Sequence, residues 1–127
     1  MKIDINVSGP VPIWRQIEDR IRRAVASGAL PPGSVVPSVR ELAVRLQVNP
    51  ATVSKAYRHL VDADVLTVRR GEGTFVGALS AEAVAGLREA ELRMVSREYV
   101  RAARALGATL GEATGAIETA WEEVNDG

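Results

Sequence analysis

The chain has 127 residues, with no cysteine and with His59 as its single histidine. This length suits one domain, or one domain with an appendage, and the residue content excludes disulfides, thiolate metal sites and multi-histidine metal sites. The formal net charge is zero, but residues 1–79 carry 11 Lys and Arg against 7 Asp and Glu, whereas residues 80–127 carry 5 against 9. A basic first part suits a module that binds phosphate groups, and an acidic second part suits a segment that stays away from them.

The first 30 residues are expected to form a short strand and an amphipathic helix. Ile3, Ile5 and Val7 alternate with polar residues, which predicts the strand. The helix is expected to begin near Pro12, because proline suits the first helical position, and to end at Gly28, which suits the left-handed position after a helix. Its apolar face is formed by Ile13, Ile17, Ile21 and Val25, which recur every four residues.

Two shorter helices with clear start signals follow a short strand expected at residues 35–36. Ser38 and Glu41 have the spacing of a capping box, in which each side chain bonds the backbone amide of the other residue. After a turn at residues 47–49, Asn49 is expected to cap a third helix and Pro50 to take its first position. Two helices joined by so short a turn predict a helix-turn-helix.

After the third helix the apolar pattern changes to a period of two. Residues 65–68 and 74–76 are typical of strands, and the glycines between them suit a tight turn. Arg69 and Arg70 lie at the tip of this expected hairpin. A hairpin directly after a helix-turn-helix is a wing.

From Ser80 onward the pattern is helical. A broad apolar stripe runs to Leu106, Gly107 ends that helix, and Thr109 and Glu112 have the spacing of a second capping box that opens a last helix. Such a helical pair has no core of its own, and a second copy of the chain is the simplest partner for its apolar face. The residues expected at this dimer interface are Leu92, Val95, Tyr99, Leu106, Ile117 and Trp121.

The outward residues of the third helix are the candidates for reading DNA. In a helix-turn-helix the first residues of this recognition helix meet base edges in the major groove. Ala51 suits a thymine methyl group, Thr52 a base or phosphate, and Lys55 a guanine or phosphate. The wing arginines suit phosphates or a minor groove. The full set of expected DNA-binding residues is Ser38, Arg40, Asn49, Pro50, Ala51, Thr52, Ser54, Lys55, Arg58, Arg69, Arg70 and Gly71.

Other interpretations of these residues stay open. Ser38 and Asn49 are fully explained as helix caps, and Arg58 suits a solvated helix face as well as a phosphate contact. An enzyme needs a nucleophile with its base, metal ligands or a phosphate loop, and the sequence offers none of these, so we expect no catalytic residue, cofactor or metal. A protein-interaction module that does not bind DNA is the alternative, although it leaves the basic wing unexplained.

Five ordered blocks of the sequence carry a family resemblance; they span residues 12–17, 37–43, 48–53, 56–60 and 69–76. Together they resemble the GntR family of bacterial regulators. The resemblance implies a winged helix-turn-helix and places Arg40, Asn49, Ala51, Thr52 and either Ser54 or Lys55 at DNA-contacting positions, with Arg70 and Gly71 at the wing contacts. The short tail resembles the YtrA subfamily, in which it implies dimerisation, and the family implies control of the protein's own operon, often one that encodes a transporter.

Two residues depart from the family pattern. Gln47 stands where the turn commonly has glycine, so a left-handed backbone there carries a strain of about 1 kcal/mol. Ala51 is small where a polar residue would read a base directly, so the operator sequence of a relative does not transfer to this chain.

The sequence therefore predicts a mainly α fold with a small β wing. Residues 1–79 are expected to form a winged helix-turn-helix DNA-binding domain, and residues 80–127 a helical dimerisation tail. The expected function is sequence-specific regulation of transcription, as a repressor that binds an inverted repeat of double-stranded DNA as a homodimer. An unknown small-molecule effector, if the protein has one, is expected between the tail helices and the domain or at the dimer interface, near Trp121 or Tyr99. Without a signal peptide or an apolar run of about 18 residues, we expect a cytoplasmic protein with no membrane contact.

Overall fold

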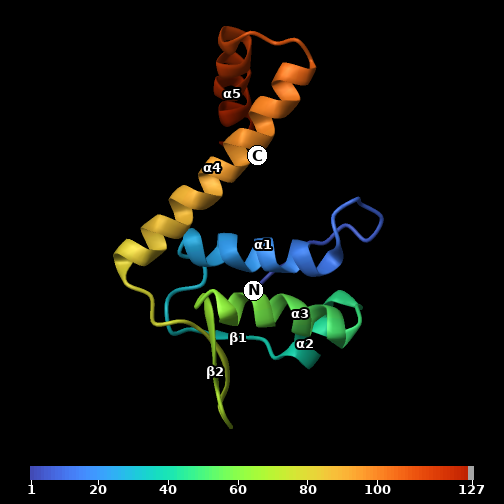
Figure 1. Cartoon of the computed structure of the whole chain (residues 1–127), viewed down its shortest axis with the longest axis vertical. Helices are drawn as coiled ribbons and strands as arrows, with labels where there is room; N and C mark the ends of the chain where they lie inside the picture. The colour runs from blue at the N-terminus through green and yellow to red at the C-terminus, as the bar shows by residue number, and fades with distance from the viewer. Residues whose placement is uncertain (126–127) are drawn as a thin grey trace. The chain divides into compact units, whose positions relative to one another are not determined.

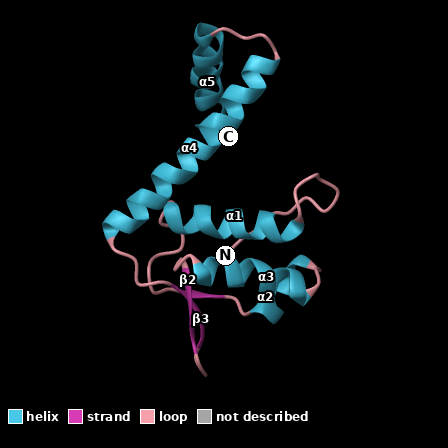
Figure 2. Ribbon diagram, viewed as in Figure 1, coloured by secondary structure: helices cyan, strands magenta, loops and turns pink. Residues whose placement is uncertain are grey.

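A computed structural model describes residues 1–125 and is mainly helical, with one small antiparallel sheet (Figures 1 and 2). It confirms the fold class expected from the sequence. No helix in the described part of the chain combines the length and the apolar character needed to cross a bilayer. The elements are, in order, α1 (Ile13–Ala26), β1 (Val35–Val36), α2 (Val39–Leu46), α3 (Pro50–Asp62), β2 (Leu66–Arg69), β3 (Gly73–Val76), α4 (Ala81–Ala105) and α5 (Leu110–Asn125).

The chain divides into two compact units, which are described separately. The first unit comprises residues 1–89 and the second begins at Ala90, so that α4 contributes to both. Leu87 of α4 packs against the core of the first unit. The functional boundary expected at residue 79 stays a prediction.

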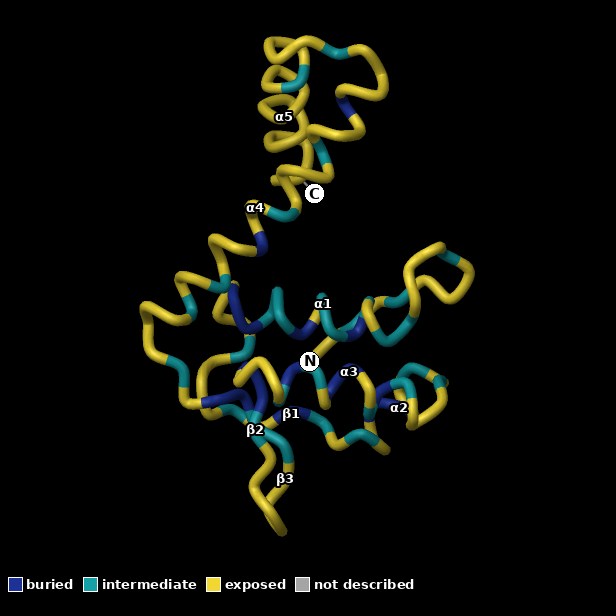
Figure 3. Tube along the Cα trace, viewed as in Figure 1, coloured by how far each residue is buried: buried dark blue, intermediate teal, exposed yellow. Residues whose placement is uncertain are grey.

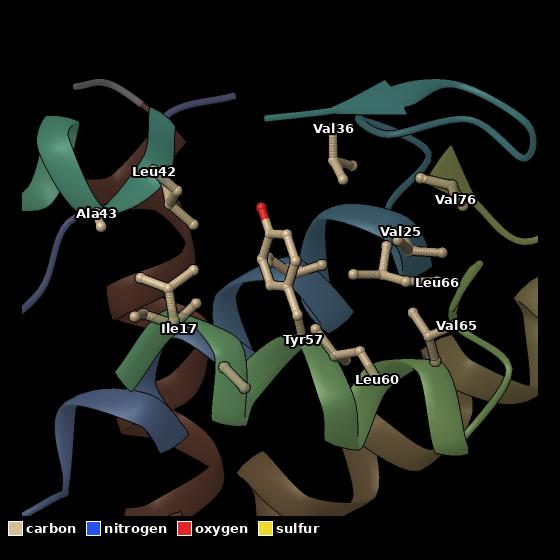
Figure 4. Packing of buried hydrophobic residues seen from close by; sticks show 13 residues of the cluster. Ile17, Val25, Val36, Leu42, Ala43, Tyr57, Leu60, Val65, Leu66 and Val76 are labelled. Carbon is tan, nitrogen blue, oxygen red and sulfur yellow. The ribbon is translucent and has the colours of Figure 1, made fainter. Parts of the chain in front are cut away.

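The core of the first unit lies among α1, α2, α3 and the sheet (Figures 3 and 4). Of the apolar residues that recur every four positions in α1, Ile17, Ile21 and Val25 are fully buried and Ile13 is half-buried, and α3 packs against this helix. Burial of each large aliphatic side chain stabilises such a core by about 1.5–3 kcal/mol. The cluster consists of Ile17, Ile21, Val25, Val36, Leu42, Ala43, Val53, Ala56, Tyr57, Leu60, Val65, Leu66 and Val76.

The sheet has the order β1-β3-β2, so the hairpin β2–β3 is extended by the two-residue strand β1. Val35 pairs with Phe75, and Thr67 pairs with Phe75 from the other side. Side chains of directly paired residues share a face, so Val35, Thr67 and Phe75 lie on one face, and Leu66 and its partner Val76 on the other. The face with Leu66 and Val76 is the buried one.

The strand expected at residues 3–7 is wrong. Within the described residues this segment forms no ladder, and Asn6 bonds a side chain instead: its amide donates to Oε1 of Gln16 (2.7 Å), and Nε2 of Gln16 donates to its carbonyl (2.9 Å). Ile3 and Ile5 nevertheless pack against the core. The alternation of Ile3 and Ile5 with polar residues therefore reflects partial burial against the core and not pairing in a sheet.

The helix ends follow the sequence signals closely, with one exception. Pro12 is the N-cap of α1, with ψ 144°, and is not its first helical residue. Gly28 has the expected positive φ of 86°. Gln47 ends α2 in the left-handed region (φ 56°, ψ 48°), as its place in the turn predicted, and the amide of Val48 then donates to the carbonyl of Ala43 (3.0 Å). A second non-glycine residue with positive φ, Asp64 (φ 62°), was not predicted.

The second unit contains the end of α4 and all of α5. The expected capping box at the start of α5 is present, since the amide of Glu112 donates to Oγ1 of Thr109 (3.1 Å) and the amide of Thr109 donates to Oε1 of Glu112 (3.0 Å). The hydroxyl of Tyr99 on α4 donates to the carbonyl of Ala113 on α5 (2.7 Å) and joins the two helices. No residue of α5 is buried.

Candidate nucleic-acid interface

Helix α3 presents one face to the core and the opposite face to solvent. Val53, Ala56, Tyr57 and Leu60 are buried at steps of three and four residues, which fixes the inner face. The opposite face carries Ala51, Lys55 and Arg58, which are exposed, and it is flanked by Thr52 and Ser54, which are half-buried. The small and basic side chains expected to read DNA therefore do lie together on the outer side of the recognition helix.

The start of α3 is fixed by its cap. Oδ1 of Asn49 accepts a hydrogen bond from the amide of Ala51 (2.8 Å), and Pro50 takes the first helical position. Both Asn49 and Pro50 are exposed. The carboxamide oxygen is thus occupied, while the NH2 group of Asn49 is a donor that the cap does not use.

Helix α2 is held against α3 at its first turn. The amide of Glu41 donates to Oγ of Ser38 (3.1 Å), and the amide of Ser38 donates to Oε1 of Glu41 (3.3 Å), which completes the predicted capping box. The hydroxyl of Tyr57 on α3 donates to the carbonyl of Pro37 (2.7 Å). Burial, together with the nearby Glu41 carboxylate, raises the pKa of Tyr57. Arg40 projects from this first turn and is exposed.

The two wing arginines differ in their surroundings. The guanidinium of Arg69 lies 4.1 Å from the centroid of the Phe75 ring. Arg70 and Gly71 form the exposed turn, closed by the amide of Glu72 donating to the carbonyl of Arg69 (2.9 Å), with Gly71 at φ 80°. The sequence predicts that both arginines lie at the tip of the wing. In the structure the Arg69 guanidinium lies against the Phe75 ring, and Arg70 lies in the turn.

Contacts between α1 and α3 add residues that the sequence reasoning did not assign to the site. Nζ of Lys55 lies 4.4 Å from the centroid of the Trp14 ring, and the His59 ring meets Trp14 edge-on, with centroids 5.0 Å apart. Nδ1 of His59 lies 3.2 Å from Oε2 of Glu18. Helical periodicity places each of these residues on its own helix but does not indicate which residues meet across the two helices.

The expected dimerisation residues lie in the tail, away from any core. Tyr99 is half-buried, whereas Leu92, Leu106 and Trp121 are 67%, 86% and 69% exposed. Val95 and Ile117 are exposed as well. Their exposure agrees with the expected interface without testing it.

Three helices, the third of which has an exposed recognition face, followed by a two-stranded wing define the winged helix-turn-helix class of DNA-binding regulators. The sequence profile of the bacterial regulatory proteins of the gntR family matches residues 14–76. The HTH-type transcriptional regulator Rv1152 of Mycobacterium tuberculosis is 36% identical over 109 residues, covering 86% of this chain and 85% of that protein. The chain belongs to the GntR family of transcriptional regulators.

Two further similarities refine this assignment. The HTH-type transcriptional repressor YtrA of Bacillus subtilis is 35% identical over 96 residues, covering 76% of this chain and 72% of YtrA, and the YtrA-like subfamily expected from the tail is thereby confirmed. The crystal structure of the AraR DNA-binding domain in complex with operator ORX1 is 27% identical, with a TM-score of 0.55. It covers 61% of this chain and 99% of that domain.

Proposed function

We propose that this regulator is a repressor that binds an inverted-repeat operator as a homodimer. The observation that carries the proposal is the outer face of α3, where Ala51, Lys55 and Arg58 are exposed; Arg40, in the first turn of α2, is exposed as well. Arg70 on the wing adds a further exposed cation for the phosphate backbone. The AraR domain forms a crystalline complex with an operator, and YtrA is named a repressor, which supports extending both properties to this chain.

The homodimer is supported by the surface of the tail. Leu92, Leu106 and Trp121 are large apolar side chains that are mostly exposed, and apolar surface gathered in this way is typically covered by a partner. In this proposal residues 80–127 are the dimerisation tail and residues 1–79 the DNA-binding domain. Because a two-fold dimer presents two identical recognition helices, the operator is an inverted repeat with half-site centres roughly 10 bp apart, or a multiple of this. The regulated genes are those of its own operon, including a transporter.

An effector, if the protein has one, is proposed to bind the tail near Trp121 or Tyr99. The hydroxyl of Tyr99 is occupied by Ala113, so Trp121, which is 69% exposed, offers the freer aromatic surface. A calorimetric screen of small molecules tests this, with Trp121→Ala as the comparison. Any ligand that binds the variant as tightly as the wild type is bound elsewhere.

Fluorescence anisotropy tests the function. Labelled DNA from upstream of the protein's own gene is compared with a scrambled duplex across a salt series. We expect selective binding that Arg40→Ala weakens by about 1–3 kcal/mol and a smaller slope with salt for Arg70→Ala. Arg20→Ala is the matched control, because it removes an exposed arginine of α1 outside the proposed interface.

The two other outcomes are informative. Equal, weak binding to both duplexes places the operator elsewhere in the genome and removes the proposal that the protein controls its own operon. No binding to any duplex, even at low salt, favours the protein-interaction module over the repressor.

A further inference from the structure

Lys55 is an exposed residue of the recognition helix, yet its side chain is held. Its ammonium lies 4.4 Å from the centroid of the Trp14 ring, a distance at which the face of an indole attracts a cation. A free lysine side chain samples many rotamers, and ordering it on binding costs conformational entropy. A lysine that is already ordered in the unbound protein loses less of that freedom when it meets DNA.

Trp14 also contacts a second residue of α3, His59. The His59 ring meets it edge-on, at an interplanar angle of 89°, and Nδ1 of His59 lies 3.2 Å from Oε2 of Glu18. Oε1 of Glu18 in turn accepts a hydrogen bond from Arg22 (3.0 Å), and the Glu18 side chain is only 13% exposed. The indole is therefore part of a connected set of side chains between α1 and α3.

We propose that Trp14 is a positioning residue for DNA binding, which holds the ammonium of Lys55 at the recognition face of α3. The inference rests on the proposed function, because it concerns how the same face meets DNA. The ring contacts one side of the ammonium only. Since a lysine ammonium has three N–H donors, those directed away from the ring can donate to a phosphate or base oxygen while the ring contact is kept.

A double-mutant cycle tests the proposal. The wild type, Trp14→Leu, Lys55→Ala and the double variant are compared on the upstream and scrambled duplexes by anisotropy. We expect Trp14→Leu to weaken binding about 3- to 10-fold in the wild-type background and less than about twofold when Lys55 is already alanine. A purely structural role of Trp14 gives the same loss in both backgrounds, and that additivity overturns the proposal.

The conservative variant Trp14→Phe keeps an aromatic face and is expected to restore most of the affinity. Thermal unfolding of each variant separates loss of binding from loss of the fold. If Trp14→Leu does not fold, the cycle is run with Trp14→Phe. Because the phenyl face attracts a cation more weakly than indole, a coupling of about twofold with Lys55→Ala is expected there, and strict additivity overturns the proposal in this case too.

The proposed function and the role of Trp14 fail in different ways. If the wild type binds both duplexes equally, operator recognition at its own gene fails, but the cycle measured on either duplex still tests Trp14, because a phosphate contact does not depend on sequence. If the wild type binds selectively and the two substitutions are additive, only the role of Trp14 fails. If no DNA is bound at all, both are overturned.

Discussion

The two compact units use the same local signals to start helices but differ in what their helices bury. The capping boxes of α2 and α5 match closely: the amide that donates to the cap hydroxyl lies 3.1 Å away both at Ser38 and at Thr109. In the first unit, α1 buries Ile17, Ile21 and Val25 completely. In the second, α5 buries none of its residues.

This difference shows that a cap decides where a helix begins, whereas burial decides whether it is stable within one chain. Isolated helices of this length are marginal in water, and packing of an apolar face supplies most of their stability. Helix α3 finds that packing against α1. Helix α5 leaves Trp121 and Leu110 69% and 80% exposed, so its apolar surface is available to a partner.

The largest effect on the free energy of unfolding is expected from a substitution in the core of the first unit. Leu60→Ala removes a fully buried side chain of α3 and is expected to lower the free energy of unfolding by about 2–5 kcal/mol, because a cavity is left in a close-packed core. Val44→Ala, at a site 77% exposed on α2, is the control and is expected to change it by less than about 0.5 kcal/mol. Chemical denaturation followed by circular dichroism measures both. Equal effects of the two substitutions contradict the burial described for α3.

A substitution in the tail tests whether the exposed apolar surface of α5 packs against a second copy of the chain. Trp121→Ala is expected to weaken the proposed dimer by about 2 kcal/mol, or roughly 30-fold in its dissociation constant, because large aromatic residues dominate such interfaces. Sedimentation velocity across a concentration series measures the shift. Glu122→Ala alters the next exposed residue of α5 and is the control. A dimer that is equally tight in both variants moves the interface away from Trp121.

Much of the fold could be predicted because the deciding signals are local. The starts of α2 and α3 follow from Ser38 and Asn49, whose side chains bond amides only two or three residues away. The expected strand at residues 3–7 was wrong because a strand needs a partner from elsewhere in the chain. Strand β1 already occupies the position next to β3 in the sheet, and the carbonyl of Asn6 accepts a hydrogen bond from the side chain of Gln16 in place of a strand partner.

The residues of the candidate site also divide into those that a local sequence pattern predicts and those that depend on contacts between distant segments. The outward face of α3 follows from helical periodicity, so Ala51 and Arg58 could be placed in advance. The contact of Lys55 with Trp14 joins two helices that are far apart in sequence, and no periodicity encodes it. The contact between Arg69 and Phe75 could have been predicted from the hairpin register, because Phe75 pairs with Thr67, and Arg69 is two residues further along the same face.

The matched capping boxes allow a smaller and more direct comparison of the units. Ser38→Ala and Thr109→Ala each remove one cap hydroxyl, at a cost of about 1 kcal/mol to the helix that follows. For Ser38 the loss is expected in the unfolding of the whole first unit, because α2 contributes Leu42 and Ala43 to its core. For Thr109 it is expected as fraying of α5 alone, seen in amide exchange. Ser38→Thr and Thr109→Ser keep a hydroxyl and are the controls, and a global loss from Thr109→Ala argues against a locally held α5.

The smallest expected effect is a dependence on pH at the start of α5. The backbone amide of Thr109 donates to the Glu112 carboxylate and, together with the Thr109 side chain, lowers the pKa of Glu112 from its ordinary value of 4.5. Because the folded pKa lies below the unfolded one, this contribution to helix stability is fully present above pH 4.5 and is lost as the pH falls through the lowered pKa. Cα chemical shifts of the first turn of α5 are therefore expected to move towards coil values on acidification below that pH. Glu112→Gln keeps an acceptor oxygen that does not titrate, so its first turn is expected to be insensitive to the same change, and identical acid fraying in both proteins rules out Glu112 as the group responsible.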